Sequence, residues 1–335
     1  MKINIKNFAS ESYLQQIEAL YAWFLSDQVE YELSSSGTTG PAQVMSFSRE
    51  ALLASAQMSV DFFELNAQTR ILLALPLDKV GGMMLALRAF LAGAEIVAVD
   101  PVRSPLEQIP EDLSIDFVSM VPNQFVASQA YWSQVKTFLI GGGPLSAAAL
   151  DRIEESNPDC QVWHSYASTE TLSHVALRQV FPKKEKSYQA MEGISFGVNA
   201  QHCLQITAQK LGLDKLQTKD VVDLISPTQF IWKGRQDNVV LSGGLKLYPE
   251  ELENQLQLSV PGFLWGQEDL ELGQRMVWVM AEADYHEGIG TEIKSQLQGS
   301  QRPKAILLVP QLEFTATDKI KREASLQKGF RSIAL

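Results

Sequence analysis

Hydroxyl-bearing residues and glycines are concentrated near the amino terminus in Ser34–Gly40, which reads Ser-Ser-Ser-Gly-Thr-Thr-Gly. Such a segment after a strand presents backbone N–H and hydroxyl donors to an anion, typically a phosphate. It is not a Walker A loop, because no Gly-Lys-Ser or Gly-Lys-Thr sequence follows its second glycine. Taken alone, the segment leaves two interpretations open, a phosphate-binding loop or a flexible surface loop.

Two further polar segments follow predicted strands. Gly141–Leu145 begins with three glycines, and His164–Thr171 places a tyrosine, a threonine and a carboxylate within five residues. An aromatic ring can stack on a base, a threonine can contact a phosphate and a carboxylate can hold Mg²⁺. Ligands of parallel sheets bind at the carboxyl ends of the strands. All three polar segments are predicted to lie at such ends.

The elements that must position these segments follow from the hydrophobic pattern. Short apolar strands are predicted at 71–75, 95–99, 117–120, 136–140 and 161–165, with helices at 80–91 and 146–155. This alternation indicates βαβ units around a largely parallel sheet. Short strands joined by turns follow from about residue 192 and indicate antiparallel structure. We therefore predict an α/β fold, with a large domain over residues 1–236 and a small α+β domain over residues 237–335.

Composition excludes several classes of function. Hydrophobic residues make up 45% of the 335 residues, which is typical of a globular protein, and the net charge of −11 disfavours binding to nucleic acid or to an anionic membrane. Cys160 and Cys203 are too few and too far apart for a disulfide framework or a zinc site. The amino terminus does not resemble a signal peptide, and the most apolar stretch, 80–94, is short and contains Arg88. A cytoplasmic location without a membrane span is expected; the oligomeric state is left open.

Later segments complete a recognisable series. Gly234-Arg235-Gln236-Asp237 and Thr317-Asp318-Lys319-Ile320-Lys321-Arg322 follow the earlier ones. In this order the segments resemble the adenylate-forming enzymes, which include acyl-CoA synthetases, peptide-synthetase adenylation domains and luciferases. Ser36–Gly40 resembles the phosphate loop of that family, and Tyr166–Glu170 resembles its Tyr-Gly-x-Thr-Glu element. Each motif is weak alone, but together they extend over nearly the whole chain from about Glu32.

The resemblance implies a binding role for ATP, Mg²⁺ and coenzyme A. The implied phosphate loop consists of Ser35, Ser36, Gly37, Thr38, Thr39 and Gly40. Gly142, Gly143 and Tyr166 would frame the adenine. Thr169 would contact the α-phosphate, Glu170 would bind Mg²⁺, and Asp220 and Arg235 would hold the ribose hydroxyls.

The resemblance also implies two conformations. Lys319 would offset the charge that develops on the carboxylate and the α-phosphate during adenylation, together with Thr169 and Glu170. The carboxyl-terminal domain would then turn about Asp237, removing Lys319 and bringing the Gly243-Gly244 loop towards the thiol of coenzyme A. Each role has a simpler alternative, since Glu170, Arg235 and Lys319 are also compatible with solvated surface charges.

The sequence departs from the family pattern at several positions. Gln43 replaces the phosphate-loop lysine, Ala167 replaces a glycine, and Asp318 replaces the glycine before the catalytic lysine. The loss of the loop cation is expected to slow adenylation. The loop begins already at Ser34, so a shortened member of the family is expected.

The closest resemblance within the family is to the o-succinylbenzoate–CoA ligases of menaquinone biosynthesis, carried by residues 75–89, 169–178 and 239–246. Such a substrate has a second carboxylate, which needs a cation or several donors when it is buried. Lys79, Arg88 and His174 are the candidates, although Arg88 could also be a surface-paired helix residue. The alternatives are a ligase for another small acid, an adenylation domain that loads a carrier protein, and a non-catalytic nucleotide-binding relative.

Overall fold

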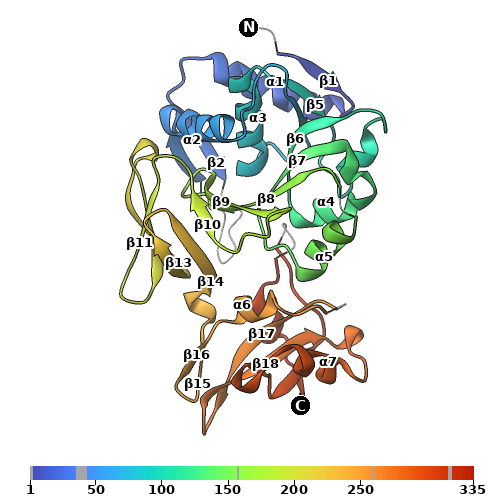
Figure 1. Cartoon of the computed structure of the whole chain (residues 1–335), viewed down its shortest axis with the longest axis vertical. Helices are drawn as coiled ribbons and strands as arrows, with labels where there is room; N and C mark the ends of the chain where they lie inside the picture. Colours follow the sequence, from blue (N-terminus) through green and yellow to red (C-terminus); the bar gives the residue numbers. More distant parts are fainter. Residues whose placement is uncertain (1–2, 35–43, 157, 259, 316–318) are drawn as a thin grey trace.

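The computed structural model describes residues 3–34, 44–156, 158–258, 260–315 and 319–335. These residues form a twelve-stranded sheet and a six-stranded sheet, with a separate two-stranded ladder. Figure 1 shows the larger sheet and its helices above the smaller sheet, which the chain enters after β14. The α/β class is confirmed.

The larger sheet changes from parallel to antiparallel at one strand, β8. Its order is β1-β5-β4-β6-β7-β8-β9-β10-β14-β13-β12-β11. The pairs from β1 to β8 are parallel, and those from β8 onward are antiparallel. The parallel strands are β1 (Ile5–Asn7), β4 (Arg70–Leu73), β5 (Glu95–Ala98), β6 (Ile115–Met120), β7 (Val135–Ile140) and β8 (Gln161–Ala167). The others are β9 (His174–Phe181), β10 (Tyr188–Ala190), β11 (Ser195–Val198), β12 (Cys203–Ala208), β13 (Leu213–Ser226) and β14 (Gln229–Arg235).

Both faces of the parallel part are buried, because side chains alternate along each strand. Ile71 and Leu73 join a core with α1 (Glu11–Leu25), α2 (Arg49–Phe62) and α3 (Val80–Ala92). Leu72 points to a second core with α4 (Pro122–Ala127) and α5 (Ala147–Ser156). Ser10 and Ser48 cap the starts of α1 and α2, since their hydroxyls accept hydrogen bonds from the backbone N–H groups three residues later.

The smaller sheet has its own hydrophobic cores and begins beyond the short 3-10 turn Gln236–Asn238. Its strands are β15 (Val240–Ser242), β16 (Leu245–Leu247), β17 (Gly262–Asp269), β18 (Gly273–Ala281), β19 (Ala305–Val309) and β20 (Arg331–Ala334). Its helices are α6 (Pro249–Glu253), α7 (Ile289–Gln296) and α8 (Arg322–Gln327). The passage between the sheets coincides with the predicted boundary at 236 and 237; the division into two domains stays a prediction.

The apolar helix α3 is thirteen residues long and carries the buried Arg88. In the described part of the chain, no helix has both the length and the apolar character that crossing a membrane requires.

Candidate active site

A tight glycine turn follows β7 and lies beside the end of β8. Ile140 pairs with His164 in the parallel ladder, and the turn begins immediately after it. A Cβ atom at Gly141 would lie only 2.7 Å from Ser165 Oγ. Gly142 has a φ of +81°, a left-handed conformation that residues with side chains rarely adopt. The backbone therefore needs glycines where the sequence predicted an adenine-binding turn.

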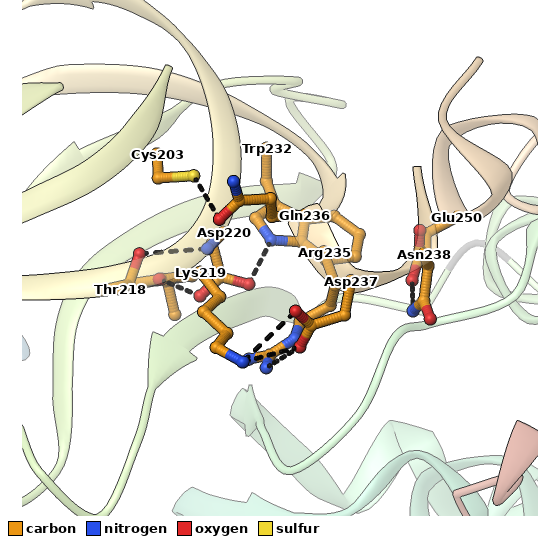
Figure 2. Close-up of polar contacts among 11 residues, drawn as sticks. Cys203, Thr218, Lys219, Asp220, Trp232, Arg235, Gln236, Asp237, Asn238 and Glu250 are labelled. Carbon is orange, nitrogen blue, oxygen red and sulfur yellow. Dashed lines mark hydrogen bonds and ion pairs between the residues drawn. The ribbon is translucent and has the colours of Figure 1, made fainter. Parts of the chain in front are cut away.

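Tyr166 of β8 meets Asp220 of β13 in a closed hydrogen-bond group. The Tyr166 hydroxyl donates to Asp220 Oδ2 at 2.6 Å, and Trp232 Nε1 donates to Oδ1 at 3.1 Å. Figure 2 shows Asp220 between Trp232 and Thr218, whose hydroxyl accepts from the Asp220 backbone N–H. Burial, and then Asp220, raise the pKa of Tyr166 well above its usual value. The phenol stays protonated and holds the Asp220 carboxylate in one orientation.

Asp237 lies next to this group and has two cationic partners. Arg235 Nη2 is 3.3 Å from Asp237 Oδ2, and Lys219 Nζ is 3.2 Å from both carboxylate oxygens (Figure 2). Arg235 also faces Asp220 across the β13–β14 ladder. The charged side chains of these pairs are about half exposed, and exposed pairs stabilise a structure only weakly.

Lys319 reaches the same region from the last part of the chain. Its backbone N–H donates to Thr315 Oγ1 at 3.0 Å, within a short bridge between Phe314 and Ile320. The side chain is solvent-accessible, but partial desolvation lowers its pKa; Arg235 acts in the same direction, and Asp220 opposes both. Lys319 therefore lies within electrostatic range of Asp220 and Arg235. Three of the predicted site residues are thus brought together.

Thr169 and Glu170 lie in the turn between β8 and β9. The Thr169 carbonyl accepts the Leu172 N–H at 3.0 Å, and the Thr171 hydroxyl braces the turn by accepting from Ser168 N–H. Glu170 is exposed and has no ion pair among the described residues. Among all the residues that the structure describes, no group of three or more His, Cys, Asp or Glu side chains could hold a metal ion. A single free carboxylate nevertheless fits Mg²⁺, which takes most of its ligands from phosphate and water.

The predicted phosphate loop, Ser35, Ser36, Gly37, Thr38, Thr39 and Gly40, lies outside the described residues, as does Gln43. The strands on either side, β2 (Glu30–Ser34) and β3 (Val44–Ser48), form the antiparallel two-stranded ladder. A strand therefore precedes the loop as predicted, but it belongs to this separate antiparallel ladder and not to the parallel sheet, so the predicted position at the end of a parallel strand is wrong for this segment. The role of the loop stays a prediction.

Gly243 and Gly244 form the two-residue turn between β15 and β16. Both have positive φ, +57° and +82°, which is the backbone of a type I′ hairpin turn. The Gly243 N–H donates to Leu272 O at 2.9 Å. The turn belongs to the smaller sheet (Figure 1), and no hydrogen bond or ion pair of the described residues joins it to the Asp220 group.

Arg88 and His174 form a second, buried group. Arg88 is 2% exposed, and its Nη2 donates to Ser173 Oγ at 2.5 Å and to His174 Nδ1 at 3.4 Å, while its Nε has no partner among the described residues. Ser59 Oγ lies 3.0 Å from His174 Nε2. Burial lowers the pKa of Arg88 to about 9, so it remains charged at neutral pH. Burial and Arg88 also lower the pKa of His174 well below its usual value, so this ring is neutral.

Lys79 occupies a different environment. It is the residue before α3, and its Nζ lies 3.0 Å from the neighbouring Asp78 carboxylate. Its side chain is 43% exposed, and no described contact joins it to Arg88. Of the three substrate candidates, the structure brings together Arg88 and His174.

Comparison with known proteins identifies the family. A family model described as AMP-binding enzyme matches residues 22–200, more than half of the chain. The chain belongs to this family of AMP-binding enzymes. The resemblance predicted from the motifs is thereby confirmed.

Relatives of this AMP-binding enzyme carry consistent names. A 2-succinylbenzoate–CoA ligase of Listeria monocytogenes is 24% identical over 90% of this chain and 70% of its own length. The enzyme of the same name from Salmonella typhimurium is 27% identical, over 94% of this chain and 72% of its own.

Solved structures support the fold. An acyl-CoA synthetase (AMP-forming)/AMP-acid ligase II-like protein from Dyadobacter fermentans is 29% identical, with 96% of each chain covered and a TM-score of 0.64. The o-succinylbenzoate CoA synthetase of Bacillus subtilis, in complex with its acyl-adenylate intermediate, has a TM-score of 0.74 at 19% identity, covering 91% of this chain and 70% of that one. At that identity the second likeness shows the fold alone.

Several contacts in this AMP-binding enzyme were not predicted from the sequence. Trp232 and Thr218 fix Asp220, while Ser173 and Ser59 complete the Arg88 group. Thr218 and Ser173 lie within two residues of predicted site residues, so proximity in the sequence was an available signal. Ser59 lies 115 residues from His174 in the sequence, so no such signal was available for it.

Proposed function

We propose that this enzyme is an ATP-dependent acid–CoA ligase that forms an acyl-adenylate and then a CoA thioester, with o-succinylbenzoate as its acid. The observation that carries the proposal is that Asp220 and Arg235 face each other across the β13–β14 ladder, with Lys319 within electrostatic range of both. The Lys319 cation would thus act close to the two residues proposed to hold the ribose.

In the first half-reaction a carboxylate oxygen bonds to the α-phosphorus of ATP, and pyrophosphate leaves. Negative charge develops around the α-phosphate, and a preorganised Lys319 cation stabilises it. Asp220 can also accept hydrogen bonds from the ribose hydroxyls. Tyr166 and Trp232 each donate one hydrogen bond to a different carboxylate oxygen, and each oxygen can accept a second one. Glu170 and the nucleotide phosphates would hold Mg²⁺, which would offset the charge of the leaving pyrophosphate.

In the second half-reaction the thiolate of coenzyme A bonds to the acyl carbonyl, and AMP leaves. The proposed domain 237–335 would turn at Asp237, so that Lys319 withdraws and the Gly243-Gly244 turn approaches the thiol. Two features support this movement. The Asp237 ion pairs are exposed and therefore weak, and the glycine turn lies on the smaller sheet rather than at the Asp220 group.

One ion pair crosses the proposed domain boundary and gives a test of the movement. Lys233 Nζ of β14 is 2.5 Å from Glu251 Oε1 of α6 and 3.1 Å from Asp223 Oδ2. Rotation of α6 would break the first contact only. Glu251→Gln should therefore slow adenylation and accelerate the thioester step, each by about twofold to fivefold, as expected for a partly exposed pair.

Single-turnover measurement of each half-reaction checks this result. Glu268→Gln is the matched control, since it makes the same charge change on the smaller sheet at an exposed glutamate with no described ion pair. A Glu251→Gln enzyme that changes both half-reactions in the same direction would contradict a contact specific to one conformation.

The proposed acid rests on the Arg88 group. A buried guanidinium whose described partners are all neutral is costly, and a ligand that brings its own carboxylate would pair with it. The names of the curated relatives also support a substrate with a second carboxylate. His174 is neutral and would act on Arg88 rather than on the carboxylate, and Lys79 stays a candidate at the start of α3.

An acid-dependent ATP–pyrophosphate exchange screen tests the proposal. We expect o-succinylbenzoate to support exchange, and AMP release with coenzyme A, far better than benzoate or palmitate. A preference for either of these would overturn the acid and leave the adenylate chemistry intact. Thioester formation only on a carrier protein would indicate an adenylation domain that loads such a carrier. The absence of exchange with every acid would indicate a non-catalytic nucleotide-binding relative, the alternative suggested by Gln43 in place of the loop lysine. Use of ATP and coenzyme A also supports the expected cytoplasmic location.

A further inference from the structure

A buried histidine on β8 is bonded to the glycine turn after β7. His164 Nε2 lies 2.9 Å from the Gly143 carbonyl oxygen. Because a carbonyl oxygen only accepts hydrogen bonds, Nε2 must carry the proton, and Nδ1 is then the acceptor. Two donors point at Nδ1: Arg178 Nη2 at 3.1 Å and the Tyr188 hydroxyl at 2.9 Å. The ring is thus fixed in one tautomer from both sides.

Burial and a neighbouring cation keep the His164 ring in this neutral form. His164 is 6% exposed, and its pKa is lowered to about 4 by burial and by the Arg178 cation, against a smaller opposing effect of its bond to Gly143. A second proton on Nδ1 would face Arg178 and remove both incoming hydrogen bonds. At neutral pH the ring therefore stays neutral, with Nε2 directed at the turn.

The same cluster supports the Tyr166 ring. Tyr188 lies edge-on to Tyr166, with ring centroids 5.9 Å apart, and stacks on Phe230 at 5.4 Å. Phe230 also contacts Tyr166 edge-on at 5.1 Å, and the Arg178 guanidinium lies 4.8 Å from the Tyr188 ring centre. One buried group therefore holds both the Gly143 carbonyl and the Tyr166 ring.

We infer that His164 is a positioning residue for the nucleotide base, held in place by Arg178 and Tyr188 and acting through Gly143 without touching the nucleotide. The inference rests on the proposed function, in which Gly142, Gly143 and Tyr166 frame the adenine. A purely structural histidine would affect only folding. A positioning histidine must affect the binding of the base, since it fixes a turn whose glycines give it little stiffness of its own.

Three variants separate these roles. His164→Leu removes the bond to Gly143, and Tyr188→Phe removes one donor to Nδ1 while keeping the ring. His164→Gln restores both functions, because an amide can donate to Gly143 and accept from Arg178 and Tyr188. Tyr13→Phe is the control, since it deletes another buried hydroxyl, which donates to Leu75 O at 2.6 Å in a different part of the core.

Isothermal titration calorimetry with AMP on the full chain gives the readout, with thermal unfolding measured in parallel. We expect His164→Leu to weaken AMP binding about tenfold, Tyr188→Phe to weaken it less, and His164→Gln to stay within about threefold of wild type. Steady-state rates should show a raised KM for ATP and an unchanged KM for the acid. Tyr13→Phe should lose stability without losing AMP affinity.

Two results would overturn the inference alone. One is a folded His164→Leu protein that binds AMP with wild-type affinity, and the other is a His164→Gln protein whose AMP affinity is as low as that of His164→Leu. A wild-type protein that binds no AMP would overturn the proposed function and the inference together. The two failures are therefore distinguishable.

Discussion

Replacement of Lys319 by alanine should lower the rate of acyl-adenylate formation by about two to three orders of magnitude, the usual scale for one preorganised electrostatic donor. The structure gives the physical reason, because Lys319 lies close enough to Asp220 and Arg235 for both to affect its pKa. The charge that develops at the α-phosphate would lose the cation that Lys319 supplies. Rapid-quench measurement of pyrophosphate release from ATP and o-succinylbenzoate checks this expectation.

The thioester step is the internal control for this variant. Supplied acyl-AMP should react with coenzyme A at nearly the wild-type rate, because Lys319 would have left the site in that conformation. Lys321→Ala is the matched control for charge, since Lys321 is an exposed lysine two residues away, before α8. Equal damage to both half-reactions would refute the two-conformation scheme.

Five of the six parallel strands, β4 to β8, were predicted because they are short and largely apolar, whereas the short, exposed β1 was not. The strand predicted at 71–75 is β4 at Arg70–Leu73, and the one predicted at 136–140 is β7 at Val135–Ile140. The long hairpin strand β13, Leu213–Ser226, was not predicted at its full length, since only short strands were expected after about residue 192. Its first half is polar and largely exposed, so it lacks the hydrophobic alternation that marks a strand.

The chemistry of the site was predictable residue by residue, but its pairings were not. Tyr166, Asp220 and Arg235 each lie in a recognisable motif, yet the bond between Tyr166 and Asp220 depends on how β8 and β13 fold together. A register shift in the β13–β14 ladder between Val221 and Val222 also decides which β14 side chains reach Asp220. Bulges of this kind depend on tertiary packing, and sequence periodicity does not show them.

The same limit applies to Arg88. The sequence left it as either a substrate ligand or a surface-paired helix residue, and the structure rejects the surface alternative because Arg88 is 2% exposed. The residues that its Nη2 contacts are His174, the first residue of β9, and Ser173 just before it, and neither lies on α3. The sequence could not show that Arg88 is buried, because the other residues of α3 are almost all apolar and do not mark which face of the helix is exposed.

Arg88→Met should therefore separate stability from function. The guanidinium has no carboxylate partner among the described residues, so its replacement by an apolar side chain of similar length should maintain or raise the free energy of unfolding. In contrast, kcat/KM for o-succinylbenzoate should fall if the distal carboxylate pairs with Arg88 in the buried site. The fall should correspond to a loss of roughly 2–5 kcal/mol of transition-state stabilisation. Lys79→Met should weaken the same substrate selectively only if Lys79 also contacts the distal carboxylate.

Parallel measurement of o-succinylbenzoate and benzoate makes the test specific. Benzoate lacks the distal carboxylate, so its weak turnover should be nearly unchanged in Arg88→Met. Arg70→Met is the matched control, because Arg70 pairs with Glu95 at 2.7 Å on the larger sheet and is part of neither proposed binding group. If Arg88→Met lost activity equally on both acids, or unfolded at a lower temperature than wild type, Arg88 would be a structural cation. The second carboxylate would then need another partner, and Lys79 would be the next candidate to examine.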